Sequence, residues 1–476
     1  MAKSSDVIVV GAGPGGLAAA RGAKEAGAER VIILERDTAA GGILNQCIHD
    51  GFGLVRYSQR LTGPEYALKA EMEAEEAGAE LRTGHHVVAI RPSSDGDGAN
   101  CRTEFEVETV SKDGLEQIKA GTIILATGCR ERTRGAIAIP GSRPAGVFTA
   151  GVIQNFVNIR NIMPGKRVVI FGSGDVGMIM ARRLSLEGAE VKAVIEILPE
   201  PAGLSRNVSQ CLYDYGIPIH CSHTISRIIG KQKLEAVEIS PLDEDMRPVK
   251  EKAQIIECDA LVLSVGLIPE NEVAETAGIG LDPKTNGVIT DEFMMTSVPG
   301  IFSCGNSRRI MDLADFVSEQ GELAGKNAVA YLNGSEMEVW DEARSTPMAK
   351  GFPEEGTVTC TLCPLGCTVR LNDETGRYEG NKCKRGIEFA EQEKMNPKRI
   401  LTSTVRCKCE SGMRLLPVRT AGQVTKTSMR RIVDELGNIT VKPPIKCGDI
   451  VHVTDDGDGS IINIIATANM QDNAPF

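Results

Sequence analysis

The chain has 476 residues, of which 42% are hydrophobic and 25% are charged, and its formal net charge is −11. This length predicts about three domains, and the acidic balance argues against a nucleic-acid-binding surface. Apolar runs stay well short of the roughly 20 residues that a membrane span needs, and a strand pattern begins directly after a short polar start. We therefore expect a cytoplasmic protein with neither a signal peptide nor a membrane span.

The segment 6–35 carries a dinucleotide-binding pattern. An apolar run at 7–10 predicts a buried strand, the spacing G-x-G-x-x-G begins at Gly11, and an Ala-rich helix and a second apolar run lead to Glu35. The glycines allow a tight turn and close approach of a pyrophosphate to the helix N-terminus, while the acid accepts hydrogen bonds from a ribose. The candidate nucleotide contacts are Gly11, Gly13, Pro14, Gly15, Gly16, Glu35 and the adjacent Arg36.

The first unit continues through a glycine-rich loop at 39–53, which contains Gly42, Cys47 and His49. A helical pattern at 64–79 and strand patterns at 87–90 and 105–110 follow. A buried strand then ends in the turn formed by Ala126, Thr127 and Gly128. We expect Gly42 and this turn to contact the nucleotide.

Residues 166–196 repeat the first unit. The glycines recur with the same spacing, and the first glycine lies 24 positions before the acid in both copies. The repeat predicts a second dinucleotide site. Glu196 would accept the 2′-hydroxyl of NAD and repel the 2′-phosphate of NADP, and 197–202 contain no Arg or Lys, so NAD(H) is favoured. The candidate contacts are Gly172, Gly174, Asp175, Val176, Gly177, Glu196 and, after a second buried strand, Gly266.

The two glycine units occur together with ATG at 126–128, SVGLIP at 264–269 and GIFSCGN at 300–306. This combination resembles the FAD-dependent pyridine nucleotide oxidoreductases. The resemblance implies an α/β fold with two Rossmann-like domains, for FAD and NAD, plus a small cysteine-rich C-terminal domain. The implied boundaries are 1–152 and 280–335 for the FAD domain, 153–279 for the NAD domain, 336–355 for a linker and 356–476 for the cysteine-rich domain.

The resemblance also implies roles for single residues. Gly305 and Asn306 would hold FAD, although the family usually has Asp in place of Asn306. Disulfide reductases of the family carry two cysteines five positions apart against the flavin, whereas here Cys47 stands alone, which disfavours dithiol exchange. Cys47 is either a single redox thiol or a packed residue. His49 either donates to the flavin or a substrate, or only orders its loop.

The tail contains seven of the 14 cysteines. Four of them, Cys360, Cys363, Cys367 and Cys383, have the spacing C-x2-C-x3-C-x15-C. Three clustered cysteines and a remote fourth are typical of a [4Fe–4S] cluster, and a flavin would gain a one-electron outlet from it; zinc or no metal are the alternatives. The remaining cysteines, Cys407, Cys409 and Cys447, are free thiols or extra ligands.

The tail also resembles a small domain of unknown function that accompanies flavoprotein dehydrogenases of glycerol 3-phosphate and 2-hydroxy acids. LTSTVR at 401–406 and RLLPVRT at 414–420 carry this resemblance. It implies an FAD-dependent NADH oxidoreductase that passes electrons between NAD(H), FAD and the cluster, in an oligomer with a partner dehydrogenase or other electron-transfer protein. The alternatives are a stand-alone NADH oxidase or a peroxide or disulfide reductase using Cys47, and a non-enzymatic assembly subunit.

Overall fold

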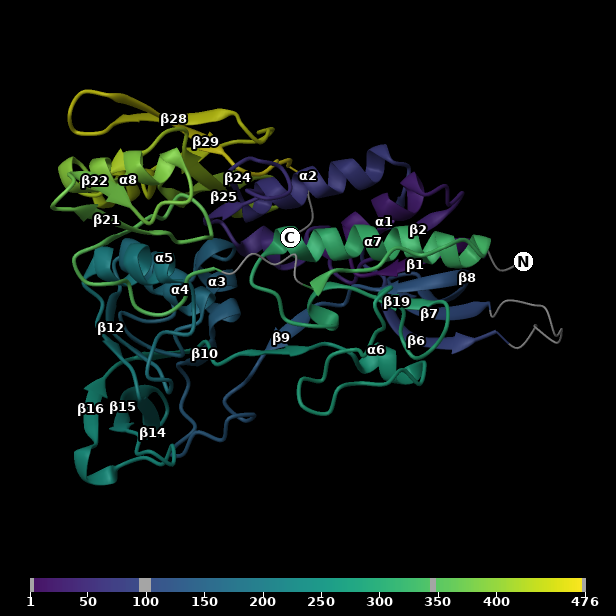
Figure 1. Cartoon of the computed structure of the whole chain (residues 1–476), viewed down its shortest axis with the longest axis horizontal. Coiled ribbons are helices and arrows are strands. Elements are labelled where there is room, and N and C mark those ends of the chain that lie inside the picture. Colours follow the sequence, from purple (N-terminus) through teal and green to yellow (C-terminus); the bar gives the residue numbers. More distant parts are fainter. Residues whose placement is uncertain (1–3, 94–103, 343–347, 473–476) are drawn as a thin grey trace. The chain divides into compact units, whose positions relative to one another are not determined.

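The computed structural model describes residues 4–93, 104–342 and 348–472, which form two compact units. Unit 1 contains the described residues up to Arg130 and those from Leu267 to 342. Unit 2 contains 131–266 and 348–472. Each unit is therefore assembled from segments that are far apart in the sequence (Figure 1). None of the helices in these described ranges is long and apolar enough to cross a membrane.

Unit 1 is built on a sheet with the strand order β5-β2-β1-β8-β7-β6, in which β19 also pairs with β8. The pairs β5–β2, β2–β1, β1–β8 and β8–β19 are parallel, and β8–β7 and β7–β6 are antiparallel. The carboxyl ends of the parallel strands therefore share one edge. The principal elements are β1 (Ser4–Val10), α1 (Pro14–Glu25), β2 (Val31–Leu34), η1 (Gly42–Gln46), β3 (Asp50–Phe52), β4 (Leu61–Thr62), α2 (Gly63–Glu76), β5 (Glu80–Arg82), β6 (His86–Pro92), β7 (Phe105–Ser111), β8 (Gly114–Leu125), β18 (Leu267–Pro269), α6 (Glu272–Thr276), β19 (Ile301–Ser303), η5 (Gly305–Ser307) and α7 (Ala314–Asn333).

Helix α7, from the second segment of unit 1, packs tightly against α1 (Figure 1). A Cβ on Gly321 would lie 2.0 Å from the carbonyl oxygen of Gly15, and one on Gly325 would lie 2.1 Å from that of Ala19. Only glycine allows backbones to approach so closely. The helix after the first glycine turn is thereby fixed against a segment about 300 positions later in the chain.

Part of the predicted linker 336–355 is folded onto unit 1. Trp340 is 6% exposed within the unit 1 core, and its backbone N–H donates to the Glu292 carbonyl at 2.8 Å. The Asn327 side chain bonds both the N–H and the carbonyl of Glu338. Residues 343–347 lie outside the described ranges, and the residues from 348 onward belong to unit 2.

The first half of unit 2 contains a parallel sheet of order β10-β17-β11-β12-β13 and an antiparallel sheet β14-β15-β16. The motif β11–α4–β12 repeats the β1–α1–β2 arrangement of unit 1. The principal elements are β9 (Cys129–Glu131), which begins in unit 1, β10 (Val147–Thr149), α3 (Ala150–Asn158), β11 (Arg167–Phe171), α4 (Asp175–Leu186), β12 (Glu190–Ile195), α5 (Ser205–Asn207), η2 (Val208–Leu212), η3 (Tyr213–Tyr215), β13 (Ile219–His220), β14 (His223–Gly230), β15 (Leu234–Pro241), η4 (Lys250–Lys252), β16 (Gln254–Glu257) and β17 (Ala260–Leu263).

The C-terminal half of unit 2 contains a five-stranded sheet of order β27-β24-β25-β29-β28 and a separate three-stranded sheet β20-β21-β22. The elements are β20 (Val358–Thr359), β21 (Thr368–Asn372), β22 (Arg377–Glu379), α8 (Lys384–Met395), β23 (Lys398–Arg399), β24 (Thr402–Cys409), β25 (Gly412–Thr420), β26 (Val424–Thr425), α9 (Met429–Leu436), β27 (Thr440–Val441), β28 (Ile450–Asp455) and β29 (Ile461–Ala466).

Helix α4 is clamped by this C-terminal half. The Arg430 guanidinium donates to the carbonyl oxygens of Ser185 and Leu186 at the C-terminal end of α4, where a cation is favourable. Leu186 also belongs to the apolar core of the C-terminal half. The buried Arg183 of α4 donates to the Ser403 hydroxyl at 3.3 Å.

A charged cluster makes a second contact between the two halves of unit 2. Arg399 donates to Asp214 at 3.0 Å and to Glu393 at 2.6 Å, and Lys426 pairs with both acids. Burial alone would raise the pKa of Glu393, but hydrogen bonds from Arg399 and Lys426 hold that pKa below its usual value. The paired charges compensate one another, so the C-terminal half and the β11–α4–β12 motif form one packed body.

Candidate functional site

The first glycine turn joins β1 to α1 and has the geometry of a nucleotide site. Gly11 has φ of +101°, and a Cβ on Gly16 would lie 1.8 Å from the Gly11 carbonyl oxygen, so both positions require glycine. A Cβ on Gly13 would meet no heavy atom within 4 Å. Gly13 is the N-cap residue of α1 and has no side chain to cap the helix. The N–H groups at the N-terminus of α1 are therefore left for a ligand.

Glu35 lies beside this turn and is 5% exposed. One carboxylate oxygen accepts from the Ala12 N–H at 2.7 Å, and the other accepts from the Asp37 N–H at 2.8 Å. A carboxylate has about four acceptor positions, so two are left for ribose hydroxyls. The neighbouring Arg36 pairs with Glu270 at 2.8 Å.

A loop returns from Glu35 to the first glycine turn. The Gly41 N–H donates to the Ala12 carbonyl at 2.8 Å, and a Cβ on Gly42 would lie 3.3 Å from the Gly13 Cα. The sequence motifs predict Gly42, but not Gly41, as a nucleotide contact. The signal for Gly41 is the glycine pair that follows Glu35 by six positions.

Residues after β8 and β19 meet the same sheet edge. Ala126 donates its N–H to the Val10 carbonyl at 2.9 Å, and the buried Thr127 hydroxyl oxygen has no hydrogen-bond partner among the residues that the structure describes. The Gly305 N–H donates to Gln320 on α7 at 3.0 Å. Asn306 accepts from the Met311 N–H at 3.0 Å, and its amide lies 3.5 Å from the Cys129 sulfur. The first glycine turn, with the unpaired Thr127 hydroxyl beside it, fits a ligand that passes along this edge of the sheet.

Cys47 and His49 lie in the loop that follows η1. Cys47 is 8% exposed, and its carbonyl accepts from the Gly63 N–H at 2.9 Å. The His49 ring lies 3.3 Å from the Asp50 carbonyl and stacks against Phe52 with ring centroids 4.8 Å apart. The burial of Cys47 favours the packed-residue interpretation over an exposed reactive thiol.

The second glycine turn, between β11 and α4, has the same design. Gly172 has φ of +97°, and its Cβ would lie 2.1 Å from the Ser264 carbonyl oxygen; a Cβ on Gly177 would lie 2.7 Å from the Ser264 Cβ. Ser264 follows β17 as Ala126 follows β8. The sequence signal for Ser264 is the parallel between SVG at 264–266 and ATG at 126–128. Gly266 ends that turn, and Val176 is 37% exposed beside Gly174.

Glu196 is 4% exposed and more fully engaged than Glu35. One carboxylate oxygen accepts from both the N–H and the hydroxyl of Ser173, and the other accepts from the Leu198 N–H at 2.9 Å. Only about one acceptor position is left for a ribose hydroxyl. The Gly203 N–H donates to the Ser173 carbonyl at 3.1 Å, which repeats the return of Gly41 to Ala12.

The four spaced cysteines gather around the β20–β21 hairpin and the start of α8. The Cys360 N–H donates to the Cys367 carbonyl at 2.9 Å. Burial raises the pKa of Cys360, and the charges of Cys363, Cys367 and Cys383 act in the same direction. At the exposed Cys383 the cost of burial is outweighed by hydrogen bonds from the Arg385 side chain and the first N–H groups of α8, which together lower its pKa.

Within residues 4–93, 104–342 and 348–472, no group of three or more His, Cys, Asp or Glu side chains is arranged to hold a metal ion. Thiolate is a donor type that suits a bound metal, but the four thiols are not drawn together onto a common centre. Thiolates repel one another until a cation compensates their charge, so metal binding and ordering of such a loop are coupled.

The remaining cysteines of the tail do not join this group. Cys407 and Cys409 are buried in the C-terminal core with sulfur atoms 3.9 Å apart. Burial and the adjacent Cys409 raise the pKa of Cys407 to about 12, so it packs as a neutral thiol. The Cys447 N–H bonds Asn469 at 2.9 Å.

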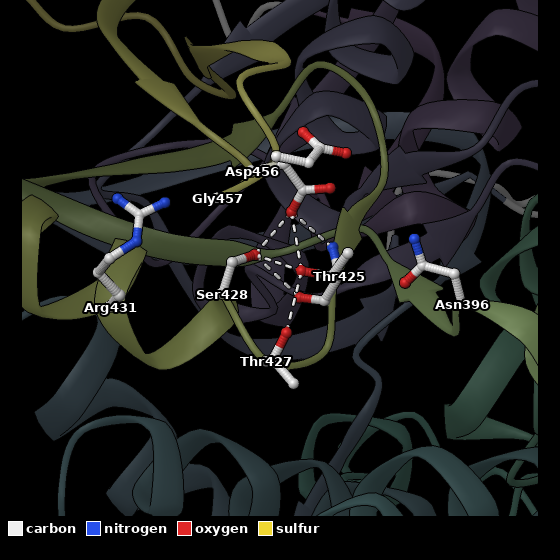
Figure 2. A pocket seen from close by; sticks show the side chains of 8 residues that line it. Asn396, Thr425, Thr427, Ser428, Arg431, Asp456 and Gly457 are labelled. Atoms are coloured by element: carbon white, nitrogen blue, oxygen red, sulfur yellow. Dashed lines mark hydrogen bonds between the residues drawn. The ribbon is translucent and has the colours of Figure 1, made fainter.

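A shallow hollow of about 380 Å³ lies at the start of α9 (Figure 2). Its central acid, Asp456, accepts from the Ser428 hydroxyl at 2.7 Å and the Thr425 N–H at 2.7 Å, and it pairs with Lys398 at 3.3 Å. The carboxylate is thus used to tie the β28–β29 hairpin to the loop before α9. The hollow is lined by neither cysteine nor the glycine turns.

Residues 5–321, more than half of the chain, match the family described as pyridine nucleotide-disulphide oxidoreductase. The chain belongs to this family. Its α/β fold therefore has the FAD- and NAD(P)H-binding architecture of the family, the chain is an oxidoreductase, and the expected fold class is confirmed. Residues 384–468 match a family described as protein of unknown function (DUF1667), which confirms the small C-terminal domain.

Known proteins similar to the chain include oxidoreductases and an enzyme subunit. Hydrogen cyanide synthase subunit HcnB of Pseudomonas protegens is 25% identical over 77% of this chain and 81% of the relative. Thioredoxin reductase of Listeria innocua is 26% identical over 69% of this chain and 94% of the relative. The crystal structure of Lactococcus lactis thioredoxin reductase aligns with a TM-score of 0.56 at 21% identity, over 69% of this chain and 99% of that one. The structural likeness shows the fold.

Proposed function

We propose that this family member is an FAD-dependent NADH oxidoreductase, with FAD on the first glycine turn and NAD(H) on the second. The observation that carries the proposal is the presence of two turns of one design, each at the carboxyl edge of its own parallel sheet and each beside a buried carboxylate. Glu35 leaves two acceptor positions and Glu196 leaves one. The first site thus offers more contacts to a resident cofactor, and the second suits an exchangeable one.

Different residues of the first site would bind different parts of FAD. The turn at Gly11–Gly16 and the N–H groups of α1 bind the pyrophosphate, and Glu35 binds the ribose. Ala126–Gly128, Gly305 and Asn306 line the path along the same sheet edge. FAD, when bound, supplies the capacity to accept a hydride. In the second site the turn at Gly172–Gly177, Glu196 and Gly266 would orient NAD(H).

Anaerobic titration of the purified full-length protein with NADH tests this proposal. We expect one FAD per chain and loss of the visible absorbance of oxidised flavin at about one NADH per flavin, because a hydride carries two electrons. NADPH at equal concentration serves as the matched control and should act more slowly. A protein that contains no flavin, or whose flavin NADH leaves oxidised, would contradict the proposal and favour a non-enzymatic assembly subunit.

Nucleotide choice is expected to depend on Glu196. In Glu196→Arg a cation replaces the carboxylate that repels a 2′-phosphate, so the ratio of kcat/KM for NADH to that for NADPH should fall by about tenfold or more. The variant Glu196→Gln removes the charge but keeps one oxygen that can accept from Ser173 or from Leu198, so it retains part of the loop anchoring. The assignment is wrong if the wild-type protein already prefers NADPH in steady-state kinetics.

We further propose that Cys360, Cys363, Cys367 and Cys383 hold a [4Fe–4S] cluster, which would supply one-electron transfer. The spacing of the four cysteines and the backbone hydrogen bond from Cys360 to Cys367 support this proposal, and zinc is the alternative. The proposed partner is a flavoprotein dehydrogenase of glycerol 3-phosphate or a 2-hydroxy acid. Support comes from the resemblance of the tail and from the similarity to HcnB, which is named as a subunit.

A second candidate is a stand-alone NADH oxidase or a peroxide or disulfide reductase that uses Cys47. The similarity to thioredoxin reductase favours a thiol-based reaction, whereas the 8% exposure of Cys47 and the absence of another cysteine in the loop 39–53 weigh against it. In Cys47→Ser this candidate predicts loss of peroxide or disulfide turnover with NADH-dependent flavin reduction retained.

A further inference from the structure

The second glycine turn and the cysteine loop, defined as residues 360–367, are joined by a short path of hydrogen bonds within unit 2. Asp175, the first residue of α4, accepts from the Leu204 N–H at 2.8 Å and from the Asn207 amide at 2.7 Å. The Ser205 N–H donates to the Ala349 carbonyl at 2.9 Å, and the Ala349 N–H donates to the Leu365 carbonyl at 3.2 Å. Leu365 lies between Cys363 and Cys367.

The residues of this path are well ordered by packing. Leu204, Ser205 and Asn207 are each at most 5% exposed, and Gln210 donates to the Asn207 amide oxygen at 2.7 Å. The strap, defined as residues 348–351, pairs with Leu204 through Lys350 in an antiparallel bridge. A movement of the cysteine loop is therefore transmitted to the Asp175 carboxylate through the strap and the segment 204–207. The buried residues of that segment are closely packed and cannot absorb the movement.

The position of Asp175 matters for a bound dinucleotide. In the first turn Pro14 occupies the corresponding place, which carries no charge. An aspartate in the first turn of a helix is attracted to the helix N–H groups and to the positive end of the dipole. A pyrophosphate needs the same groups. The Gly177 N–H donates to the Ser264 hydroxyl at 3.1 Å. While Leu204 and Asn207 engage the carboxylate, the N–H groups of Asp175 and Val176 stay open, since Gly174 supplies no side-chain cap.

We propose that Asp175, Asn207 and the strap couple the NAD(H) site to the cysteine loop, so that disturbing the loop releases Asp175 and weakens NAD(H) binding. Asp175 is then a positioning residue whose carboxylate is kept off the nucleotide site by the segment 204–207. The inference rests on the proposed function in two respects: NADH is taken as the ligand of the second turn, and Cys363 is taken as a metal ligand that orders the cysteine loop. By linkage, bound NADH in turn stabilises the native arrangement of the cysteine loop.

Equilibrium titration of the full-length protein with NADH, followed by NADH fluorescence under anaerobic conditions, tests the coupling. We expect Cys363→Ser to weaken NADH binding about fivefold. This is the change in affinity that corresponds to the energy of one typical helix-capping interaction. In the double variant Asp175→Ala/Cys363→Ser the competitor is gone, so its affinity should equal that of Asp175→Ala. Cys447→Ser, the same substitution outside the cysteine loop, is the matched control and should bind as the wild type does.

The test requires wild-type protein that contains metal and Cys363→Ser protein whose metal loss has been confirmed by metal analysis. In that pair, equal NADH affinity, or a Cys363→Ser effect that persists without Asp175, would overturn the inference while leaving the proposed function intact. Absence of NADH binding to the wild type would overturn both. Amide hydrogen exchange is a readout that needs no nucleotide: in Cys363→Ser the segment 204–207 should exchange faster than in Cys447→Ser. Identical exchange in these two variants would also overturn the coupling.

Discussion

The variant Gly13→Val is expected to fold and to contain almost no flavin. The added side chain points into space where no protein atom lies within 4 Å, so the fold has no clash to absorb. The same space is the path of the pyrophosphate past the N-terminus of α1, so flavin occupancy should fall at least about tenfold. The ratio of flavin absorbance to protein after gel filtration measures the loss, and circular dichroism reports the fold.

Valine substitutions at two other glycines serve as controls for Gly13→Val. Gly422→Val also places its Cβ where nothing lies within 4 Å, but far from the glycine turns in sequence, and should keep its flavin. Gly16→Val places a Cβ 1.8 Å from a backbone oxygen and should destabilise unit 1 itself. Full flavin occupancy in Gly13→Val would show that the first turn does not bind the pyrophosphate of FAD.

The variant Cys363→Ser is expected to lose its iron while retaining its flavin. Serine exchanges a soft thiolate for a poor iron ligand, so iron should fall from about four atoms per chain to a small fraction of that number. Unit 1, which contains the proposed flavin site, lacks this loop, so NADH should still reduce the flavin. Iron analysis and the low-temperature electron paramagnetic resonance signal of the reduced protein measure the cluster.

Cys447→Ser is the control for thiol loss in the same unit, and it should keep its iron. The zinc alternative predicts a different outcome: wild-type protein prepared without oxygen would contain zinc and no iron, and Cys363→Ser would lose stability rather than colour. That metal content would exclude an iron–sulfur relay in this chain.

Much of the two nucleotide sites follows from local sequence. Strand, turn and helix occupy adjacent residues, so the spacing of Gly11, Gly16 and Glu35 carries the geometry of the turn without long-range information. The repeat at 172–196 predicts the second turn for the same reason, and both turns have the expected conformation. The helical pattern at 64–79 is likewise present as α2 (Gly63–Glu76).

The contents of each site depended on residues that the motifs do not contain. Ser173 takes an acceptor position of Glu196 that its counterpart Ala12 leaves open on Glu35, because alanine has no hydroxyl. Ser264 and Thr127 reach the turns from strands about 90 and 115 positions later in the chain. Local spacing cannot specify such contacts, because they arise only when distant strands pair in one sheet.

The sequence by itself determined two dinucleotide turns, the α/β class and a cysteine-bearing C-terminal segment, because each depends on periodicity or spacing within about 30 residues. Only the tertiary structure decided that Trp340 packs on unit 1, that the tail clamps α4 through Arg430, and that the cysteine loop contacts the strap behind Asp175. These contacts join segments that lie up to about 240 positions apart. Such pairings are selected by the fit of buried apolar surfaces and by the need to pair buried polar groups, and neither has a local signature in the sequence.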